Sequence, residues 1–297
     1  MRLAVTGKNG QVVSALRKLA PADLEIVTLG RPELDLAQPE TVSQALHEAK
    51  PDALVSAAAY TAVDKAESEK DIAFSINRDG AAALAKTAHD LGIPIIHLST
   101  DYVFDGDKTT AYVESDPPGP RSVYGQSKLE GEKAVAAATG NHVILRTAWV
   151  YSEYGNNFVK TMLRLGESRD EINVVADQFG CPTSANDIAE ATIKIARRLS
   201  QDSSIRLRGI FHLAGAGETN WANFARKVFA FSAENGGKPV VVTDITTAEY
   251  PTAARRPVNS RLDCSKLDEV YGIRLPDWQK STRAVVSTLA QIKKEQP

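Results

Sequence analysis

The pair formed by Tyr124 and Lys128 has the residue types and the spacing to move a proton. The two lie four residues apart in the stretch SVYGQSKLEGEKAV, and side chains at that distance share one face of a helix. A phenol has a pKa of about 10, so proton exchange near neutral pH needs a shift of about 3 units, roughly 4 kcal/mol. An ammonium group beside the phenol favours its ionised form. The spacing predicts an acid–base pair, although one of the eight tyrosines could meet a lysine at this distance by chance.

Two hydroxyl groups precede this pair at the end of an apolar run. The stretch IPIIHLST, residues 93–100, is typical of a buried strand and ends with Ser99 and Thr100. Ligands of doubly wound sheets bind outside the carboxyl ends of the strands. A hydroxyl that holds a carbonyl oxygen, a tyrosine that protonates it and a lysine that tunes the tyrosine form a complete acid–base set for the reduction of a ketone. We therefore expect Thr100, Tyr124 and Lys128 to be catalytic.

A glycine turn follows the first apolar run of the chain. In TGKNGQVV, Gly7 and Gly10 lie three residues apart, and a helix is expected to begin at about Gln11. Such glycines let the backbone approach a pyrophosphate, to which the helix N-terminus offers N–H groups. Val13 stands where a third glycine is usual. The turn predicts a dinucleotide site; the alternative is a tight turn that needs glycine for its dihedral angles alone.

The end of the second apolar run bears on the choice of cofactor. An Asp or Glu at this place would bind the adenosine ribose, but the chain has Gly30 and Arg31. An arginine can accommodate a 2′-phosphate, which slightly favours NADPH over NADH. The alternative is that Arg31 is an ordinary surface residue. Asp35 is a candidate for contacts to the adenine end, or a neighbour that caps a helix.

The order of elements that must position these residues is typical of an α/β protein. Apolar runs at residues 2–7, 24–30, 52–59, 93–100 and 142–150 predict strands, and the alanine-rich stretches at 12–20, 40–49, 81–92 and 127–138 predict helices between them. Alternation of this kind predicts a doubly wound parallel sheet of the Rossmann type. We expect residues 1–150 to form a dinucleotide-binding domain. Residues 151–297 are expected to form mainly a smaller α/β substrate lobe, with some elements returning to the first domain.

Composition excludes several classes of protein. The chain of 297 residues is 43% hydrophobic, carries a formal net charge of −2 and spreads its basic residues, so nucleic acid is not an expected partner. No uninterrupted apolar run reaches the roughly 20 residues of a membrane span, so a membrane is not expected either. The opening residues lack the features of a secretory signal, which predicts a cytoplasmic protein. Cys181 and Cys264 are isolated and are expected to be inert. The five histidines form no metal-ligand spacing, and His97 and His212 are expected to be core residues.

Seven segments together resemble one enzyme family. They are TGKNGQ, AAAYTAVDKAE, STDYVFDG, YGQSKLEGE, RTAWVYSEYGNNFVKTML, DQFGCPT and RRPVNSRLD. The sequence resembles the dTDP-4-dehydrorhamnose reductase family of the extended short-chain dehydrogenase/reductase superfamily, from residue 3 to about residue 268. The tyrosine–lysine pair and the glycine turn occur across that superfamily, whereas AAAYTAVDKAE, WVYSEYGNNF and RRPVNSRLD are narrower signals.

The resemblance implies roles for individual residues. Tyr124 would donate the proton, Lys128 would also bond the nicotinamide ribose, and Thr100 and Asp101 would hold the sugar near its keto group. Trp149 would pack against the sugar ring, unless it is a core aromatic. Arg255 and Arg256 would face the nucleotide diphosphate, unless they are solvated surface charges. The implied cofactor contacts are Gly10, Gln11 and Val12 at the phosphates, Asp35 and Leu36 at the adenine, Ala59, Tyr60 and Thr61 along the cofactor path, and Leu98 at the nicotinamide half.

The same resemblance implies an activity. The chain would reduce the C4 ketone of dTDP-4-dehydro-β-L-rhamnose with NADPH or NADH, yielding dTDP-β-L-rhamnose for surface polysaccharide. The alternatives are another nucleotide-sugar reductase or epimerase, and a non-catalytic NADP-binding regulatory subunit. Some family members bind magnesium at a dimer contact, but Ala15 stands where the first carboxylate would be. We therefore expect no metal, and a homodimer is left open.

Overall fold

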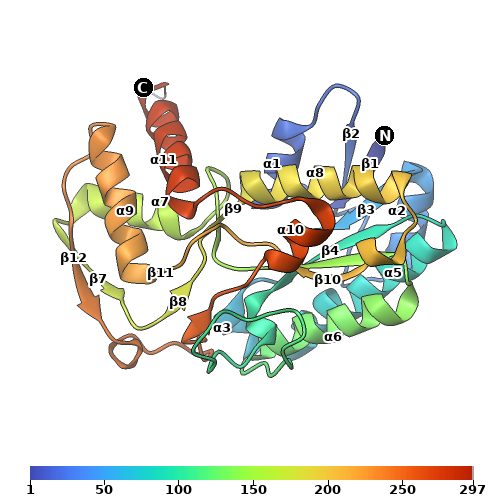
Figure 1. Cartoon of the computed structure of the whole chain (residues 1–297), viewed down its shortest axis with the longest axis horizontal. Helices are drawn as coiled ribbons and strands as arrows, with labels where there is room; N and C mark the ends of the chain where they lie inside the picture. Colours follow the sequence, from blue (N-terminus) through green and yellow to red (C-terminus); the bar gives the residue numbers. More distant parts are fainter. Residues whose placement is uncertain (296–297) are drawn as a thin grey trace.

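A six-stranded parallel sheet forms the centre of the computed structural model, which describes residues 1–295 (Figure 1). Its strands are β1 (Arg2–Thr6), β2 (Glu25–Leu29), β3 (Ala53–Ser56), β4 (Ile95–Thr100), β5 (His142–Thr147) and β10 (Gly209–His212). They stand in the order β10-β5-β4-β3-β1-β2, and every neighbouring pair is parallel. The order reverses at β1 and β3, the kind of place where doubly wound sheets bind ligands.

Five helices cover the sheet: α1 (Gln11–Leu19), α2 (Glu40–Ala49), α5 (Ala81–Asp90), α6 (Val123–Ala138) and α8 (Ala185–Gln201). Figure 1 shows α1 and α8 on one side of the sheet and α5 and α6 on the other. Leu3 and Val5 of β1 lie in the hydrophobic core with α1 and α8, whereas Ala4 lies in the core with α2 and α5. Successive strand residues face opposite sides, so burial of both faces explains why the strands are almost continuously apolar.

The structure confirms the predicted α/β class and the parallel, doubly wound sheet. Each of the five predicted strands and four predicted helices is present. Val13, which replaces the third glycine, is 2% exposed and belongs to the core beneath α1. A branched apolar side chain at this position therefore serves the contact between helix and sheet.

A second hydrophobic core lies beside the sheet, at the left of Figure 1. It is built from α7 (Phe158–Ser168), α9 (Trp221–Glu234) and α11 (Trp278–Glu295), together with the parallel pair β7 (Glu171–Val175) and β12 (Val241–Ile245). Its aromatic residues include Tyr151, Phe224 and Trp278, all buried. The smaller set of strands and helices predicted after residue 150 therefore has a core of its own.

Several short elements complete the fold. They are β6 (Val150–Tyr151) paired with β9 (Thr183–Ser184), β8 (Phe179–Gly180) between β11 (Thr219–Asn220) and β13 (Asn259–Ser260), and the helices α3 (Val63–Ala66), α4 (Lys70–Phe74) and α10 (Ser265–Tyr271). Single turns of 3-10 helix lie at Asp101–Val103, Ile205–Leu207 and Thr247–Glu249, and Ser75–Gly80 is π-helical.

Two elements of the second half return to the large sheet. β10 pairs with β5 at the edge, and α8 packs against α1. The core on that face includes Phe211 of β10 and Ile188 of α8. The division at residues 1–150 and 151–297 remains a prediction.

None of the helices within residues 1–295 combines the length and the apolar character needed to cross a bilayer. The cytoplasmic location remains a prediction.

Candidate functional site

The first turn of α6 carries Tyr124, and the second carries Lys128. Ser122 caps the helix, because its hydroxyl accepts a hydrogen bond from the Gly125 N–H at 3.1 Å. A Cβ atom added to Gly125 would overlap the Tyr102 carbonyl oxygen, so only glycine lets α6 approach the turn that follows β4. The sequence thus begins the helix at the residue that places Tyr124 beside the end of β4.

Tyr124 meets Thr100 as predicted. Thr100 lies close enough to Tyr124 to influence its pKa, and the Thr100 hydroxyl donates to Asp101 Oδ1 at 3.0 Å. The Tyr102 ring stands edge to face with the Tyr124 ring, with centroids 5.5 Å apart. A phenol and a hydroxyl therefore lie together outside the carboxyl end of β4.

The pKa of Tyr124 differs from the sequence-based expectation. Burial raises this pKa above the ordinary phenol value, the nearby Thr100 hydroxyl lowers it in part, and the charge of Asp101 raises it further. Proximity to Lys128 along the helix was expected to favour the ionised form, but desolvation dominates. Tyr124 is therefore a protonated phenol at neutral pH, the form in which it can donate a proton.

Lys128 is 3% exposed and points into the space between α6 and the sheet. Its Nζ donates to the Leu98 carbonyl oxygen at 2.7 Å and lies 3.3 Å from His97 Nε2. Burial lowers the pKa of Lys128 to about 8, while the charge of Glu132 acts in the opposite direction. The predicted contact region at Leu98 is thus tied to Lys128 through the backbone of β4.

Ser99 is separated from the site although it adjoins Thr100. Its hydroxyl donates to Glu132 Oε1 at 2.5 Å, and Glu132 forms a buried ion pair with Arg146 at 2.7 Å. Neighbouring strand residues face opposite ways, so only one of the two hydroxyls can meet Tyr124. Of the two candidates, Thr100 is the one beside the phenol.

Asp101 is a buried carboxyl group, 4% exposed, next to Thr100. Burial raises its pKa to about 6, and the nearby hydroxyls of Ser260 and Thr100 oppose that rise. Its position at the end of β4 agrees with the predicted contact to a bound sugar.

The glycine turn lies at the carboxyl end of β1. Gly7 has a φ of +99°, a conformation that favours glycine, and Gly10 precedes α1 without a side-chain cap. Gln11 Oε1 accepts hydrogen bonds from Ser152 at 2.8 Å and Asn157 at 3.1 Å. Because Gly10 has no side chain, it does not cap the backbone N–H groups of Gln11 and Val12 in the first turn of α1.

The end of β2 lies beside the glycine turn. A Cβ atom on Gly30 would meet Lys8 Cγ at 3.2 Å, and Lys8 Nζ donates to the Arg31 carbonyl oxygen at 2.9 Å. The Arg31 side chain is exposed. Asp35 Oδ1 accepts from the Ala37 N–H at 3.0 Å, in the turn that precedes α2, whose N-cap is Pro39. Leu36 is 6% exposed and packs in the core, so its side chain offers little surface to a ligand.

The residues after β3 occupy the next position along the same edge of the sheet. Ala59 and Tyr60 are half-buried and Thr61 is exposed. The Tyr60 hydroxyl donates to Glu69 Oε2 at 2.5 Å, and this bond raises the pKa of Tyr60 to about 12. Because parallel strands end at one edge, the predicted cofactor residues from β1, β2, β3 and β4 follow each other there.

A cleft of about 1290 Å³ lies between the sheet and the second core. Thr61, Tyr102 and Trp149 line it, together with Trp221 and Arg256. Trp149 has a φ of +50°, unusual for a residue other than glycine, and its ring stacks on Trp221 at 3.6 Å between centroids. The predicted sugar-facing tryptophan is thus part of an aromatic wall.

The neighbouring residues Arg255 and Arg256 have different surroundings. Arg256 pairs with Asp64 at 2.6 Å, and both line the cleft. Arg255 is exposed and lies 3.4 Å from Asp107. The structure therefore places Arg256, but not Arg255, at the cleft.

Sequence reasoning missed Trp221 and Asp64 as cleft residues. Trp221 begins α9, far along the chain from Trp149, and no spacing linked them. Asp64 lies within AAAYTAVDKAE, so the segment that carried the resemblance held the signal.

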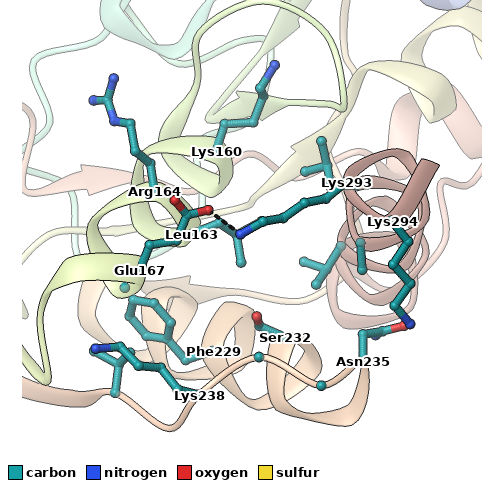
Figure 2. A pocket seen from close by; sticks show the side chains of 17 residues that line it. Lys160, Leu163, Arg164, Glu167, Phe229, Ser232, Asn235, Lys238, Lys293 and Lys294 are labelled. Atoms are coloured by element: carbon teal, nitrogen blue, oxygen red, sulfur yellow. Dashed lines mark hydrogen bonds and ion pairs between the residues drawn. The ribbon is translucent and has the colours of Figure 1, made fainter. Parts of the chain in front are cut away.

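A smaller cavity of about 720 Å³ lies among α7, α9 and α11. Figure 2 shows Lys293 reaching from α11 toward Glu167 on α7, where the two form an ion pair of 2.8 Å. Apolar side chains such as Leu163 and Phe229 form part of its lining. The residues that line it include none of the predicted site residues.

The remaining predictions concern isolated residues. His97 and His212 are buried and hydrogen-bonded, as expected of core histidines. Burial raises the pKa of Cys181 to about 11 and that of Cys264 to about 12, so both remain unreactive thiols, as predicted. Ala15 is fully buried on the inner face of α1. Within residues 1–295 no group of three or more acidic, histidine or cysteine side chains is arranged to hold a metal ion.

Comparisons with known proteins agree with this geometry. A family model described as the RmlD substrate binding domain matches residues 1–291. The dTDP-4-dehydrorhamnose reductase of Sinorhizobium fredii is 62% identical over 289 residues, which cover 97% of this chain and 98% of that relative. A solved structure of a dTDP-4-dehydrorhamnose reductase from Clostridium acetobutylicum has a TM-score of 0.90 at 37% identity, covering 97% of this chain and 99% of the other. A Bacillus anthracis dTDP-4-dehydrorhamnose reductase in complex with NADP has a TM-score of 0.89 at 36% identity, covering 96% and 98%.

Proposed function

The chain belongs to the dTDP-4-dehydrorhamnose reductase family, and we propose that Tyr124, Thr100 and Lys128 carry out its reaction. It is an NADP-dependent oxidoreductase that reduces the C4 ketone of dTDP-4-dehydro-β-L-rhamnose to dTDP-β-L-rhamnose, in dTDP-rhamnose biosynthesis. The single observation that supports the residue roles best is the position of Tyr124 and Lys128 on α6, where Tyr124 lies beside Thr100 at the end of β4 and Lys128 is bonded to the Leu98 carbonyl.

Tyr124 is the proton donor in this proposal. When bound, NADPH supplies the hydride. The Thr100 hydroxyl orients the ketone oxygen, and Tyr124 gives that oxygen its proton as the C–O bond becomes a hydroxyl. The raised pKa of Tyr124 supports this direction of transfer, because the phenol holds its proton until a more basic oxygen forms.

Lys128 supports Tyr124 from the next turn of the helix. Its ammonium is held between the Leu98 carbonyl and His97, so its place is set before any ligand binds. A positive charge there stabilises the negative charge that remains on the Tyr124 oxygen after proton transfer. This effect arises during the reaction and does not require an ionised tyrosine beforehand.

The edge of the sheet fits a dinucleotide. Gly7 in its positive-φ conformation, Gly10 and the uncapped start of α1 leave the backbone open at the glycine turn. Arg31 is exposed beside Gly30, where a cation can meet a 2′-phosphate. The other residues proposed to hold the cofactor are Gln11, Val12, Asp35, Leu36, Ala59, Tyr60, Thr61 and Leu98.

The large cleft is the proposed site of the nucleotide sugar. Trp149 is proposed to pack against the sugar ring, and Asp101 and Thr100 to bond it near the ketone. Arg256 offers a positive charge for the diphosphate in the same cleft. A homodimer and a cytoplasmic location are retained as predictions from the sequence.

A reductase assay tests the proposal. Purified protein with dTDP-4-dehydrorhamnose should oxidise NADPH, and Tyr124→Phe should lower kcat by about 10²- to 10⁴-fold. Tyr271→Phe is the matched control, since it removes a hydroxyl that donates to the Leu207 carbonyl at 2.5 Å, away from the site. Full activity of Tyr124→Phe would overturn its role. Tight NADPH binding without turnover of any nucleotide sugar would instead favour the regulatory subunit.

A further inference from the structure

Three buried polar side chains, those of Lys128, His97 and Ser56, contact one another in series between α6 and the sheet. Lys128 Nζ is 3.3 Å from His97 Nε2, and His97 Nδ1 is 2.9 Å from Ser56 Oγ. Ser56 and His97 are each 2% exposed. This series of contacts links α6 to β4 and β3, and the sequence predicted neither His97 nor Ser56 as a site residue.

Register explains why these residues meet. Ser56 and His97 are direct partners in the parallel pair β3 and β4, so their side chains lie on the same face of the sheet. The next residue of β4 on that face is Ser99, which contacts Glu132, one helical turn beyond Lys128. His97 and Ser99 therefore both face α6, and His97 lies beside Lys128.

The side chains of Lys128, His97 and Ser56 determine which group donates and which accepts in these contacts. An ammonium group has three donors and no acceptor, so His97 Nε2 must accept from Lys128. His97 Nδ1 then carries the ring hydrogen and donates it to Ser56. Burial and the charge of Lys128 both hold the pKa of His97 well below its usual range, so the ring is neutral.

We propose that His97 is a positioning residue that, oriented by Ser56, holds the Lys128 ammonium in its working place. With the Leu98 carbonyl it binds two of the three ammonium N–H groups, which leaves one for the reaction site. A four-carbon side chain loses much rotational freedom when it is held in this way, and two fixed acceptors offset that cost. The inference rests on the proposed function of Lys128.

Substitutions of His97 can show whether its side chain holds Lys128 in place or only fills space in the core. The side-chain oxygen of glutamine reaches the place of Nε2 and can accept from Lys128, whereas that of asparagine reaches only the place of Nδ1. His97→Gln should therefore stay within about 3-fold of the normal kcat. His97→Asn and His97→Leu should lose roughly 10- to 100-fold in kcat, the effect of one hydrogen bond to a charged group, with little change in KM.

Three results would overturn the proposal. They are equal losses in His97→Gln and His97→Leu, full kcat in His97→Asn, and a loss that follows the melting temperature of the variants alone. Ser56→Ala leaves the ring in place and should lower kcat several-fold, which keeps the test open if a His97 variant fails to fold. Lys128→Met is measured in parallel. Full activity of Lys128→Met would reject the proposed role of Lys128. A loss of activity in Lys128→Met with full activity in His97→Asn would reject only the positioning role of His97.

The tautomer can be read without any reaction. In ¹⁵N-histidine NMR spectra of the full chain, His97 should give the neutral form with hydrogen on Nδ1, assigned by its loss in His97→Gln. Ser56→Ala should disturb this signal and leave that of His212 unchanged. A ring with hydrogen on Nε2, or a charged ring at neutral pH, would contradict the proposed bond to Lys128.

Discussion

Asp64 and Arg256 form an ion pair of 2.6 Å across a separation of 192 residues. Both lie at the large cleft, and the Arg256 guanidinium also lies 3.5 Å from the Tyr102 hydroxyl. Arg255, its immediate neighbour, contacts Asp107 at the surface. Adjacent arginines of the same motif are therefore expected to differ in function.

Arg256→Ala should weaken substrate binding. Loss of a charge-assisted contact to a diphosphate costs about 1.5–3 kcal/mol, which should raise the KM for the nucleotide sugar by roughly 10- to 100-fold. Arg255→Ala is the matched control and should leave KM within about 2-fold, because exposed ion pairs contribute little. Steady-state kinetics with both variants check this, and equal effects would reject the assignment of Arg256.

The reaction should slow at alkaline pH. Burial lowers the pKa of Lys128 to about 8, so its ammonium form prevails below that pH and is lost above it. Since the ammonium supports Tyr124, kcat/KM should fall by about tenfold per pH unit above pH 8. Lys128→Arg keeps its charge and should lose this alkaline limb, at a lower absolute rate. A wild-type profile that stays flat to about pH 10 would speak against the role of the Lys128 charge.

Asp101→Asn should stabilise the fold while impairing turnover. The folded pKa of about 6 lies above the ordinary value of 3.8, so the stability contributed by the proton is present below about pH 4 and lost as pH rises through 6. At pH 7 the buried charge is a cost, and its removal should raise the unfolding free energy by up to about 3 kcal/mol.

Denaturation of Asp101→Asn at about pH 7 and about pH 4 checks this prediction, because the gain should disappear at the lower pH. The exposed Asp90 provides the control, and Asp90→Asn should change stability by no more than about 0.5 kcal/mol. A destabilised Asp101→Asn at pH 7 would show that the carboxylate is favourably bound.

Gly131→Ala should destabilise α6. A Cβ atom at this position would overlap the Asn77 carbonyl oxygen in the π-helical segment. A backbone atom cannot move aside as the end of a flexible side chain can. Overpacking of this kind costs roughly 1–3 kcal/mol, and a displaced α6 should also lower kcat. A Cβ atom added to Gly140 would have no heavy atom within 4 Å, so Gly140→Ala should be neutral or slightly stabilising. Equal melting temperatures for the two variants would contradict the close approach.

Arg31→Ala should change the preference between cofactors. Without a cation beside Gly30, the KM for NADPH should rise by about 10-fold or more, while that for NADH stays the same. Arg17, exposed at the end of α1, is the control for loss of a surface charge. An equal rise for both cofactors would assign Arg31 to some part of the dinucleotide other than the 2′-phosphate.

Local pattern was enough to predict the fold class and the central residues of the site. The apolar runs predicted every strand from β1 to β5, and a helical spacing of four placed Tyr124 and Lys128 together. The pairing of strands far apart in the sequence could not be predicted, because nothing in GIFHLAG shows that β10 lies beside β5. The same holds for Trp221, whose stacking on Trp149 depends on how α9 packs.

The electrostatics of the site could not be predicted from spacing. The expectation for Tyr124 rested on a neighbouring charge, but its pKa is decided by how many atoms surround it, which only the packed structure shows. His97 illustrates the same limit: an apolar strand predicted its burial, but the register of β3, β4 and α6 decides which polar groups it meets.

The return of α8 and β10 to the large sheet has a consequence for synthesis of the chain. One face of the sheet lacks α8 until residue 201 has left the ribosome, and β5, paired with β4, lacks its outer neighbour β10 until residue 212 has done so. Until then the nascent chain carries an uncovered apolar surface and an open strand edge, both of which promote aggregation. The glycine turn and the tyrosine–lysine pair are thus synthesised well before the sheet that aligns them is complete.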